Sequence, residues 1–207
     1  MIKTKGLKFN YDNQVFFEFP DINLISGENL LIIGSSGIGK TTLLHLLAGL
    51  LKSESGSIEL FGNEISLLSS HQLDRFRKNN IGIVFQRPHF VNSLTVKENL
   101  QLAQYIAKKK DNNRIESILK NLNISDKANK KTNQLSQGEK QRASIALAIV
   151  NSPKLILADE PTSSLDDNNC TNVINLLQKQ ATEFGAQLVV ITHDSRVKKY
   201  FKKSVEL

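Results

Sequence analysis

The sequence predicts an α/β fold built around a mostly parallel sheet. Apolar runs of strand length alternate along the chain with segments of helical spacing, an alternation typical of a parallel sheet covered on both faces. A tight glycine-rich turn, Gly34–Gly39, joins a buried strand predicted at Asn29–Ile33 to an apolar helix predicted at Lys40–Leu51. Between Arg87 and Val150 the spacing becomes mainly helical. We therefore expect one sheet domain that carries a helical insert.

The other elements follow from the same signals, taken in chain order. Apolar and aromatic runs bounded by turn residues predict strands at Leu7–Tyr11, Val15–Phe19 (on either side of Asp12-Asn13), Ser57–Phe61, Ile81–Phe85, Leu155–Ala158 and Gln187–Ile191. Apolar residues at helical spacing predict helices at Thr95–Lys109, Arg114–Leu122, Gln137–Val150 and Asn168–Phe184, with a polar loop at Ser125–Asn133.

Composition excludes several classes of protein. The single cysteine, Cys170, excludes an internal disulfide and a cysteine-cluster metal site. No apolar run approaches the roughly 18 residues that cross a bilayer, so at a membrane another chain would have to supply the span. The chain starts without a charged-then-apolar leader, which predicts a cytoplasmic location.

The net charge of +7 is compatible with a nucleic-acid partner or an acidic membrane surface. Much of the excess lies in Lys108–Lys131 and in the tail from Arg196 to Lys203. Apart from Tyr200-Phe201, these segments lack the interleaved aromatic residues that stack on bases. We interpret both as solvated faces and do not expect a nucleic-acid partner.

The glycine-rich turn fits the phosphate-binding pattern G-x-x-x-x-G-K-[ST] at every fixed position. Glycines let successive backbone N–H groups turn inward, and the following helix points its positive N-terminal end at the same anion. Lys40 adds a charge near the β- and γ-phosphates, and the Thr41 hydroxyl can bind Mg²⁺. The motif predicts nucleotide binding but leaves ATPase, GTPase and kinase open. Its residues are Gly34, Ser35, Ser36, Gly37, Ile38, Gly39, Lys40 and Thr41.

An apolar strand that ends in two carboxylates supplies a candidate hydrolytic pair. Asp159 stands at the strand end, where a Walker-B aspartate holds Mg²⁺, and Glu160 beside it can orient a water or accept its proton. Alone, the pair fits a helix-capping function before Pro161 equally well. The phosphate-binding loop elsewhere in the chain favours catalysis.

His193 follows the strand predicted at Gln187–Ile191, whose end opens on the same crevice of a parallel sheet. It could donate a hydrogen bond to the γ-phosphate and so sense its presence. A lone histidine after a strand is more often structural, and its position at the crevice is what favours a functional role.

The segment Leu135–Arg142, which reads LSQGEKQR, resembles the signature motif of the ATP-binding-cassette (ABC) ATPase family. Gln86 resembles the family's Q-loop glutamine, Ser164-Leu165-Asp166 its D-loop and His193 its switch histidine. Tyr11 stands where the family places an aromatic ring that stacks on adenine. These motifs occur in the family's order, and the resemblance covers essentially the whole chain.

The resemblance implies a P-loop NTPase (RecA-like) fold, with a small antiparallel β subdomain and an inserted helical subdomain beside the parallel core. It also implies ATP hydrolysis with Mg²⁺, in which Gln86 joins Thr41 and Asp159 at the metal. Glu160, His193 and Gln86 are then the catalytic residues. We expect 1–207 to be a single domain, with the core and β subdomain at 1–86 and 151–207 and the helical subdomain at 87–150.

The resemblance further implies a dimer with two ATP at its interface. Ser136 and Gly138 stand at a predicted helix start, which offers another array of N–H groups and a positive dipole end. In the family this second anion site closes over the γ-phosphate held by a partner subunit. Gln137 and Glu139 stand where the family usually has glycine and glutamine, and Ile38 and Thr42 also differ. The expected nucleotide contacts outside the phosphate-binding loop are Tyr11, Thr42, Ser136, Gln137, Gly138 and Glu139.

Within the family, Ile81–Gln86 and Ser93–Leu100 resemble the lipoprotein-release and macrolide-export group, whose ATPases drive partner membrane proteins. This implies a homodimer, or a heterodimer with a related ATPase, on the inner face of the cell membrane. A permease subunit is expected to contact it near Arg87–Asn99. Two alternatives stay open: a soluble family member acting on DNA or ribosomes, and a small-molecule P-loop kinase. The kinase interpretation leaves the signature segment unexplained.

Overall fold

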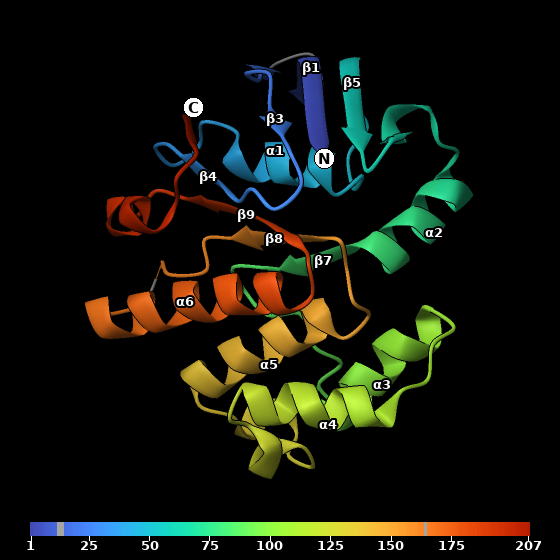
Figure 1. Cartoon of the computed structure of the whole chain (residues 1–207), viewed down its shortest axis with the longest axis vertical. Coiled ribbons are helices and arrows are strands. Elements are labelled where there is room, and N and C mark those ends of the chain that lie inside the picture. The colour runs from blue at the N-terminus through green and yellow to red at the C-terminus, as the bar shows by residue number, and fades with distance from the viewer. Residues whose placement is uncertain (12–14, 164) are drawn as a thin grey trace.

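The computed structural model describes residues 1–11, 15–163 and 165–207, and its centre is a five-stranded parallel sheet (Figure 1). All neighbouring strands in it are parallel, so their carboxyl ends share one edge. The predicted α/β class with a mostly parallel sheet is confirmed. The strand order is β10 (Ser204–Glu206), β4 (Leu30–Ile33), β9 (Gln187–Thr192), β8 (Leu155–Asp159) and β7 (Ile81–Val84).

Helices cover both faces of this sheet. α1 lies on one face, α5 and α6 lie on the other, and α3 and α4 lie beyond α5 (Figure 1). The helices of the described residues are α1 (Lys40–Leu47), α2 (Ser70–Asn80), α3 (Val96–Ile106), α4 (Asn112–Asn121), α5 (Gln137–Ile149) and α6 (Asp167–Glu183). Short 3₁₀ helices are η1 (Ile65–Leu67), η2 (Ser125–Lys127), η3 (Thr132–Gln134) and η4 (Ser195–Tyr200).

Alternate residues of the central strands belong to two different hydrophobic cores. In β8, Leu155 and Leu157 pack into the core that includes α1, whereas Ile156 and Ala158 pack into the core that includes α5 and α6. All four side chains are fully buried. Since side chains alternate between the faces of a strand, a strand buried on both faces must be apolar throughout.

A second, antiparallel sheet lies beside α1 (Figure 1). A close approach between β1 and β5 requires glycine at Gly56, because a Cβ there would lie 2.4 Å from the Gly6 carbonyl oxygen. The strand order is β2 (Val15–Glu18), β1 (Ile2–Tyr11), β5 (Ser55–Leu60) and β6 (Asn63–Glu64), with β3 (Asn23–Leu24) also pairing with β1.

Several element boundaries differ from the sequence prediction. α1 ends at Leu47 rather than Leu51, because Gly49 takes a left-handed conformation (φ +64°) and ends the helix. The predicted polar loop Ser125–Asn133 contains the turns η2 and η3. The helix α2 and the strands β3, β6 and β10 were not predicted. α2 has no buried residue, so its apolar periodicity is weak. The sequence signal that could have predicted the start of this helix is its capping box, formed by Ser69 and Gln72.

Within the described ranges, we find no helix that combines the length and apolar character needed to cross a membrane.

Candidate functional site

The carboxyl ends of β4, β7, β8 and β9 bring four sequence-distant segments to one edge of the parallel sheet. The glycine-rich turn follows β4, Gln86 follows β7, Glu160 follows β8 and His193 follows β9. The structure therefore brings these predicted site residues together around one hollow, which we call the strand-end crevice. Its volume is about 240 Å³, and its lining is Phe17, Ser36, Gly37, Gly39, Lys40, Thr41, Thr42, Gln86, Glu160 and His193.

The turn after β4 depends on glycine at two positions. Gly37 and Gly39 have φ values of +84° and +102°, in the left-handed region that glycine adopts without strain. A Cβ on Gly39 would lie 2.5 Å from a ring carbon of Phe17, whereas a Cβ on Gly37 would meet nothing within 4 Å. Gly37 thus borders open space, and a loop without side chains there can present backbone N–H groups to an anion.

Lys40 opens α1, and its ammonium group lies inside this loop. Nζ donates hydrogen bonds to the carbonyl oxygens of Gly34 (2.9 Å) and Ser35 (2.8 Å). It also lies 3.6 Å from Oε1 of Glu160. Lys40 is only 7% exposed, so the charge is held in place within the crevice. A polyphosphate in the loop would meet this ammonium group directly.

Thr41 places a hydroxyl beside the buried carboxylate of Asp159. Its Oγ1 donates to Oδ2 of Asp159 at 3.2 Å. Burial raises the pKa of Asp159 above its ordinary value, the hydrogen bond from Thr41 opposes that shift, and the charge of Glu160 adds to it. A hydroxyl and a carboxylate are hard oxygen ligands of the kind that Mg²⁺ prefers. Among the described residues, no group of three or more His, Cys, Asp or Glu side chains could hold a metal alone.

Glu160 ties the ends of β8 and β9 together through its carboxylate. The carboxylate accepts hydrogen bonds from Thr192 Oγ1 (2.8 Å) and from the backbone N–H of His193 (3.1 Å). Nδ1 of His193 lies 2.9 Å from Oε1. The backbone of Glu160 is left-handed, with φ +44°, which costs a non-glycine residue about 1–3 kcal/mol. Such strain concentrates at functional sites, and here it aims a carboxylate at the crevice.

A second polar region lies at the start of α5, away from the strand-end crevice. Ser136 is the N-cap: its Oγ accepts from the Glu139 N–H (3.3 Å), and Glu139 Oε2 accepts from the Ser136 N–H (2.8 Å). A Cβ on Gly138 would meet nothing within 4 Å. Gln137 and Gly138 line a hollow of about 550 Å³ that shares no lining residue with the strand-end crevice. Within the described chain, the hollow beside the predicted signature segment is therefore separate from the one at its own phosphate-binding loop.

Comparison with known proteins decides between the nucleotide-binding classes. A family model described as ABC transporter matches residues 20–163. The match begins before the glycine-rich turn, ends three residues after Glu160 and spans more than half of the chain. The chain belongs to the ABC transporter family.

Relatives along the full length support the same family. The ATP-binding protein LolD of a lipoprotein-releasing system, from Bacteroides thetaiotaomicron, is 35% identical over 100% of this chain and 96% of that protein. The bacitracin export ATP-binding protein BceA of Halalkalibacterium halodurans is 36% identical over 98% of this chain and 81% of that protein. The predicted resemblance to the lipoprotein-release group is confirmed by the first of these.

Solved structures share this fold. The dimeric structure of MJ0796, described as a bacterial ABC transporter cassette, matches with a TM-score of 0.89 and 32% identity, covering 100% of this chain and 94% of the other. The same cassette in a post-hydrolysis state, bound to ADP and Pi, also matches with a TM-score of 0.89. This chain is therefore an ATP-binding cassette and an ATPase, and the predicted P-loop NTPase fold is confirmed.

Of two residues assigned by resemblance in this ABC ATPase, Gln86 lies in the crevice and Tyr11 lies outside it. Gln86 lines the crevice, and its Nε2 is 3.5 Å from Ser163 Oγ. Tyr11 is 42% exposed and does not line the crevice, although its hydroxyl lies 3.4 Å from Thr42 Oγ1. In the predicted D-loop, Ser164 lies outside the described residues, and Asp166 is the N-cap of α6.

Phe17 is a lining residue that the sequence analysis missed. Its ring lies over Gly39, at the entrance of the phosphate-binding loop, and makes an edge contact with Tyr11 at 6.2 Å between ring centroids. The pairing of β1 and β2 sets Phe17 opposite Phe9, one register step from the pair that includes Phe16. Phe16 is 70% exposed. The strand alternation was the signal that could have separated the two phenylalanines.

A charge network behind the crevice was also missed. Asp194, which follows His193, accepts two hydrogen bonds from the Arg196 guanidinium (2.8 and 2.7 Å) and one from Thr162 Oγ1 (3.0 Å). These bonds, chiefly those from Arg196, lower the pKa of Asp194 to about 2. Arg196 also bonds Asp167 at the start of α6. The segments that follow β8 and β9 are therefore linked behind the crevice as well as through Glu160.

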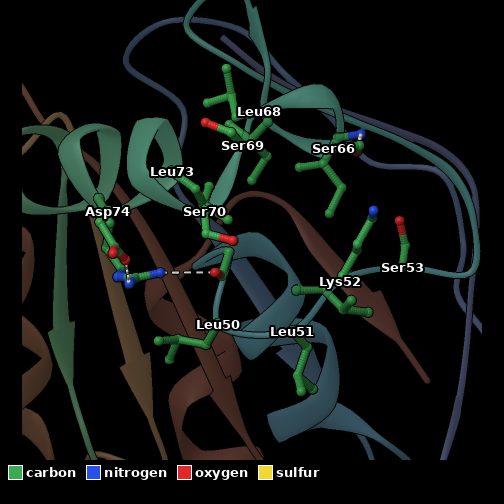
Figure 2. Close-up of a pocket in the computed structure, with 15 residues that line it drawn as sticks. Leu50, Leu51, Lys52, Ser53, Ser66, Leu68, Ser69, Ser70, Leu73 and Asp74 are labelled. Atoms are coloured by element: carbon green, nitrogen blue, oxygen red, sulfur yellow. Dashed lines mark hydrogen bonds and ion pairs between the residues drawn. The ribbon is translucent and has the colours of Figure 1, made fainter.

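A larger hollow elsewhere does not fit the chemistry of the family. Figure 2 shows it between the end of α1 and the start of α2, with Leu50, Leu51 and Leu73 near Lys52, Ser66 and Ser69. Its volume is about 410 Å³. Among the described residues, neither the turn Gly34–Gly39 nor the ends of the parallel strands line it, so we do not assign the nucleotide to this place.

Proposed function

We propose that this ABC ATPase forms a head-to-tail dimer around two ATP and drives a partner membrane protein. The observation that carries the proposal is the separation of its two polar regions. The strand-end crevice gathers groups suited to phosphate and water, whereas the start of α5 offers N–H groups to an anion that its own loop does not supply. In a two-fold dimer each copy completes the site of the other.

Within one chain, the phosphate contacts fall to the glycine-rich turn and Lys40. The backbone N–H groups of Gly34–Thr42 surround the β- and γ-phosphates, and Lys40 exchanges its loop carbonyls for phosphate oxygens. Phe17 and Tyr11 lie on the side of the turn where the sugar and base would extend. The position of adenine on Tyr11 rests on the family resemblance. The edge contact between the rings of Phe17 and Tyr11, which holds Tyr11 near the turn, supports it.

Mg²⁺ would bind at Thr41, Asp159 and Gln86, with phosphate oxygens and water completing its shell. The metal supplies charge neutralisation on the β- and γ-phosphates. The two oxygens that would bind the metal, Oγ1 of Thr41 and Oδ2 of Asp159, already lie 3.2 Å apart. Since Asp159 must be ionised to bind Mg²⁺, its raised pKa lets protons compete with the metal as the pH falls.

Glu160 is the group that would activate water. Its carboxylate points into the crevice, is held by Thr192 and His193, and lies beside the buried Lys40. A fixed carboxylate within one water of the γ-phosphate can act as a general base. His193 keeps the carboxylate oriented through Nδ1, which leaves Nε2 free to face the phosphate.

The second half of each ATP site consists of Ser136, Gln137, Gly138 and Glu139 from the other copy. Their helix start carries a positive potential, and Gly138 leaves room for close backbone approach. The partner is a second copy of this chain or a closely related ATPase. The dimeric MJ0796 cassette, similar over the whole chain, supports this arrangement.

The membrane partner is proposed from the relatives. LolD and BceA are named as ATP-binding proteins of a lipoprotein-releasing system and of bacitracin export. We place the contact with a permease at Arg87–Asn99, within a helical subdomain at 87–150, on the inner face of the membrane. Asn99 fixes this segment, because its side chain bonds both the N–H and the carbonyl oxygen of Val91 (2.9 and 3.2 Å). Val91 itself is 44% exposed.

Purification of the full chain from detergent-solubilised membranes of its own cell tests the proposal. We expect an integral membrane protein to co-purify in fixed ratio to the ATPase and to stimulate its ATP hydrolysis when both are reconstituted in vesicles. Recovery of ribosomes or DNA without a membrane protein would contradict the proposal.

A further inference from the structure

Glu139 brings a negative charge to the start of α5, where the proposed dimer needs to receive a phosphate. Its carboxylate accepts a hydrogen bond from the Ser136 N–H, and this bond is the main reason why the pKa of Glu139 lies below its ordinary value. Glu139 is therefore ionised at neutral pH. A helix start attracts anions, but a fixed carboxylate there uses part of that attraction and repels an incoming phosphate.

Among the described residues, Lys127 is the cation that forms an ion pair with this carboxylate, and it lies outside α5. Its Nζ lies 3.3 Å from Oε1 of Glu139 and 2.9 Å from Oδ2 of Asp126. Both carboxylates raise the pKa of Lys127. The side chains of Lys127 and Glu139 are 32% and 27% exposed, and ion pairs at such places contribute little to folding.

The position of Lys127 fits a countercharge to Glu139 better than a structural support of α5. α5 is already capped by Ser136 and Glu139, so the helix does not need Lys127 to begin. Lys127 ends η2, in a different segment of the chain, and reaches across to the one acid in the first turn of α5. Its ammonium group offsets the charge that would face a phosphate.

We propose that Lys127 is a positioning residue of the second half of the ATP site. It holds the carboxylate of Glu139 in the capping box and offsets part of its negative charge, so that the start of α5 can accept the γ-phosphate bound by a second copy. This inference rests on the proposed dimer. It implies that loss of Lys127 harms dimer formation only while residue 139 is an acid.

A double-mutant cycle in the full-length Glu160→Gln chain tests the inference. Sedimentation velocity measures the ATP concentration at which half of the chains are dimeric, at low and at moderate salt. We expect Lys127→Ala to raise this midpoint about fivefold at low salt, and less at moderate salt. Glu139→Gln should leave the midpoint equal or lower. The double variant should match Glu139→Gln within about twofold.

Lys179→Ala is the control, because it removes the same charge from an ion pair on α6; its midpoint should not move. If the Glu160→Gln chain does not dimerise with ATP at all, the proposed dimer itself is wrong. If it dimerises but Lys127→Ala has no effect, the inference about Lys127 is wrong. The inference is equally wrong if Lys127→Ala raises the midpoint to the same extent with Glu139→Gln present, because a purely structural role predicts that result.

Discussion

The strand-end crevice and the start of α5 are both built for an anion, but they are assembled in different ways. In the crevice, Lys40 opens α1, whereas Glu160 and His193 follow the strands β8 and β9. Glu160 contacts both Lys40 and His193 across the fold. At the start of α5, Ser136 and Glu139 bond each other within one helical turn. The crevice is therefore preorganised by tertiary structure, whereas the start of α5 is a helix end whose ligand must come from elsewhere.

The two regions therefore carry different functions. Binding and hydrolytic groups that must hold fixed distances are placed on rigid neighbouring strands. The group that must meet and leave a second chain is placed on a separate helix, beyond the central sheet. Changes in the crevice should therefore affect ATP binding or chemistry within each chain, whereas changes at the start of α5 should weaken the association of two chains and leave ATP binding by the single chain unchanged.

The largest effect is expected for Glu160→Gln. Loss of a general base costs about 10²- to 10⁴-fold in rate, while the groups that contact phosphate stay in place. Phosphate release from ATP should fall by that factor, and ATP affinity should stay within about twofold of the unchanged chain. Glu54→Gln, at an exposed residue, is the matched control. A normal rate in Glu160→Gln would show that another group activates the water.

Lys40→Ala should weaken ATP binding itself. It removes a buried charge that would bond phosphate, and such charged hydrogen bonds contribute enough for a loss of about 10- to 100-fold in affinity. Calorimetric titration with ATP and Mg²⁺ measures the effect. Lys52→Ala removes an equal charge beside the hollow of Figure 2 and should bind ATP normally. If ATP affinity fell equally in both variants, the assignment of the nucleotide to the crevice would be wrong.

Ser136→Ala should separate the two regions. The chain offers a matched control in Ser69, which caps α2 through the same kind of capping box. Each substitution should cost about 1 kcal/mol of unfolding free energy. In the Glu160→Gln background, only Ser136→Ala should raise the ATP concentration needed for dimers, by about tenfold, with monomer ATP binding unchanged. If both variants dimerised at the same ATP concentration, the start of α5 would not be part of the ATP site.

The smallest effect on function is expected from the network behind the crevice, which contributes to stability and depends on pH. Arg196 lowers the pKa of Asp194 to about 2 in the folded chain, whereas an unfolded aspartate titrates at about 3.9. The ionised group therefore stabilises the fold fully above about pH 4, by on the order of 2 kcal/mol, and this contribution is lost as the pH falls toward about 2. Urea unfolding of Asp194→Asn and the unchanged chain should show a difference at pH 6 that shrinks at pH 3. A constant difference would mean that the ion pair does not set the stability.

The parts of the fold that the sequence predicted well are those with a local signal. The turn Gly34–Gly39 and the apolar run before Asp159 are continuous segments, and their chemistry can be recognised without knowing what lies beside them. The start of α5 at Ser136 is recognisable for the same reason. Parallel pairing then follows from the alternation of strands and helices.

The parts that were missed depend on tertiary contacts. Phe17 lines the crevice because β2 pairs with β1 and lies over Gly39, and the pair Asp194 and Arg196 gains its role from Thr162 and Asp167, which belong to another segment. α2 was missed for a different reason, since its residues are half-buried or exposed and show no apolar stripe.

The mass of the particle shows directly whether two chains share two ATP. The Glu160→Gln chain of 23.1 kDa is incubated with ATP and Mg²⁺, and light scattering coupled to gel filtration measures the mass while nucleotide is quantified in the same peak. We expect a particle of two chains with one ATP per chain, which Ser136→Ala forms only at about tenfold higher ATP and Ser69→Ala forms normally. A single chain that retains one ATP would contradict this expectation.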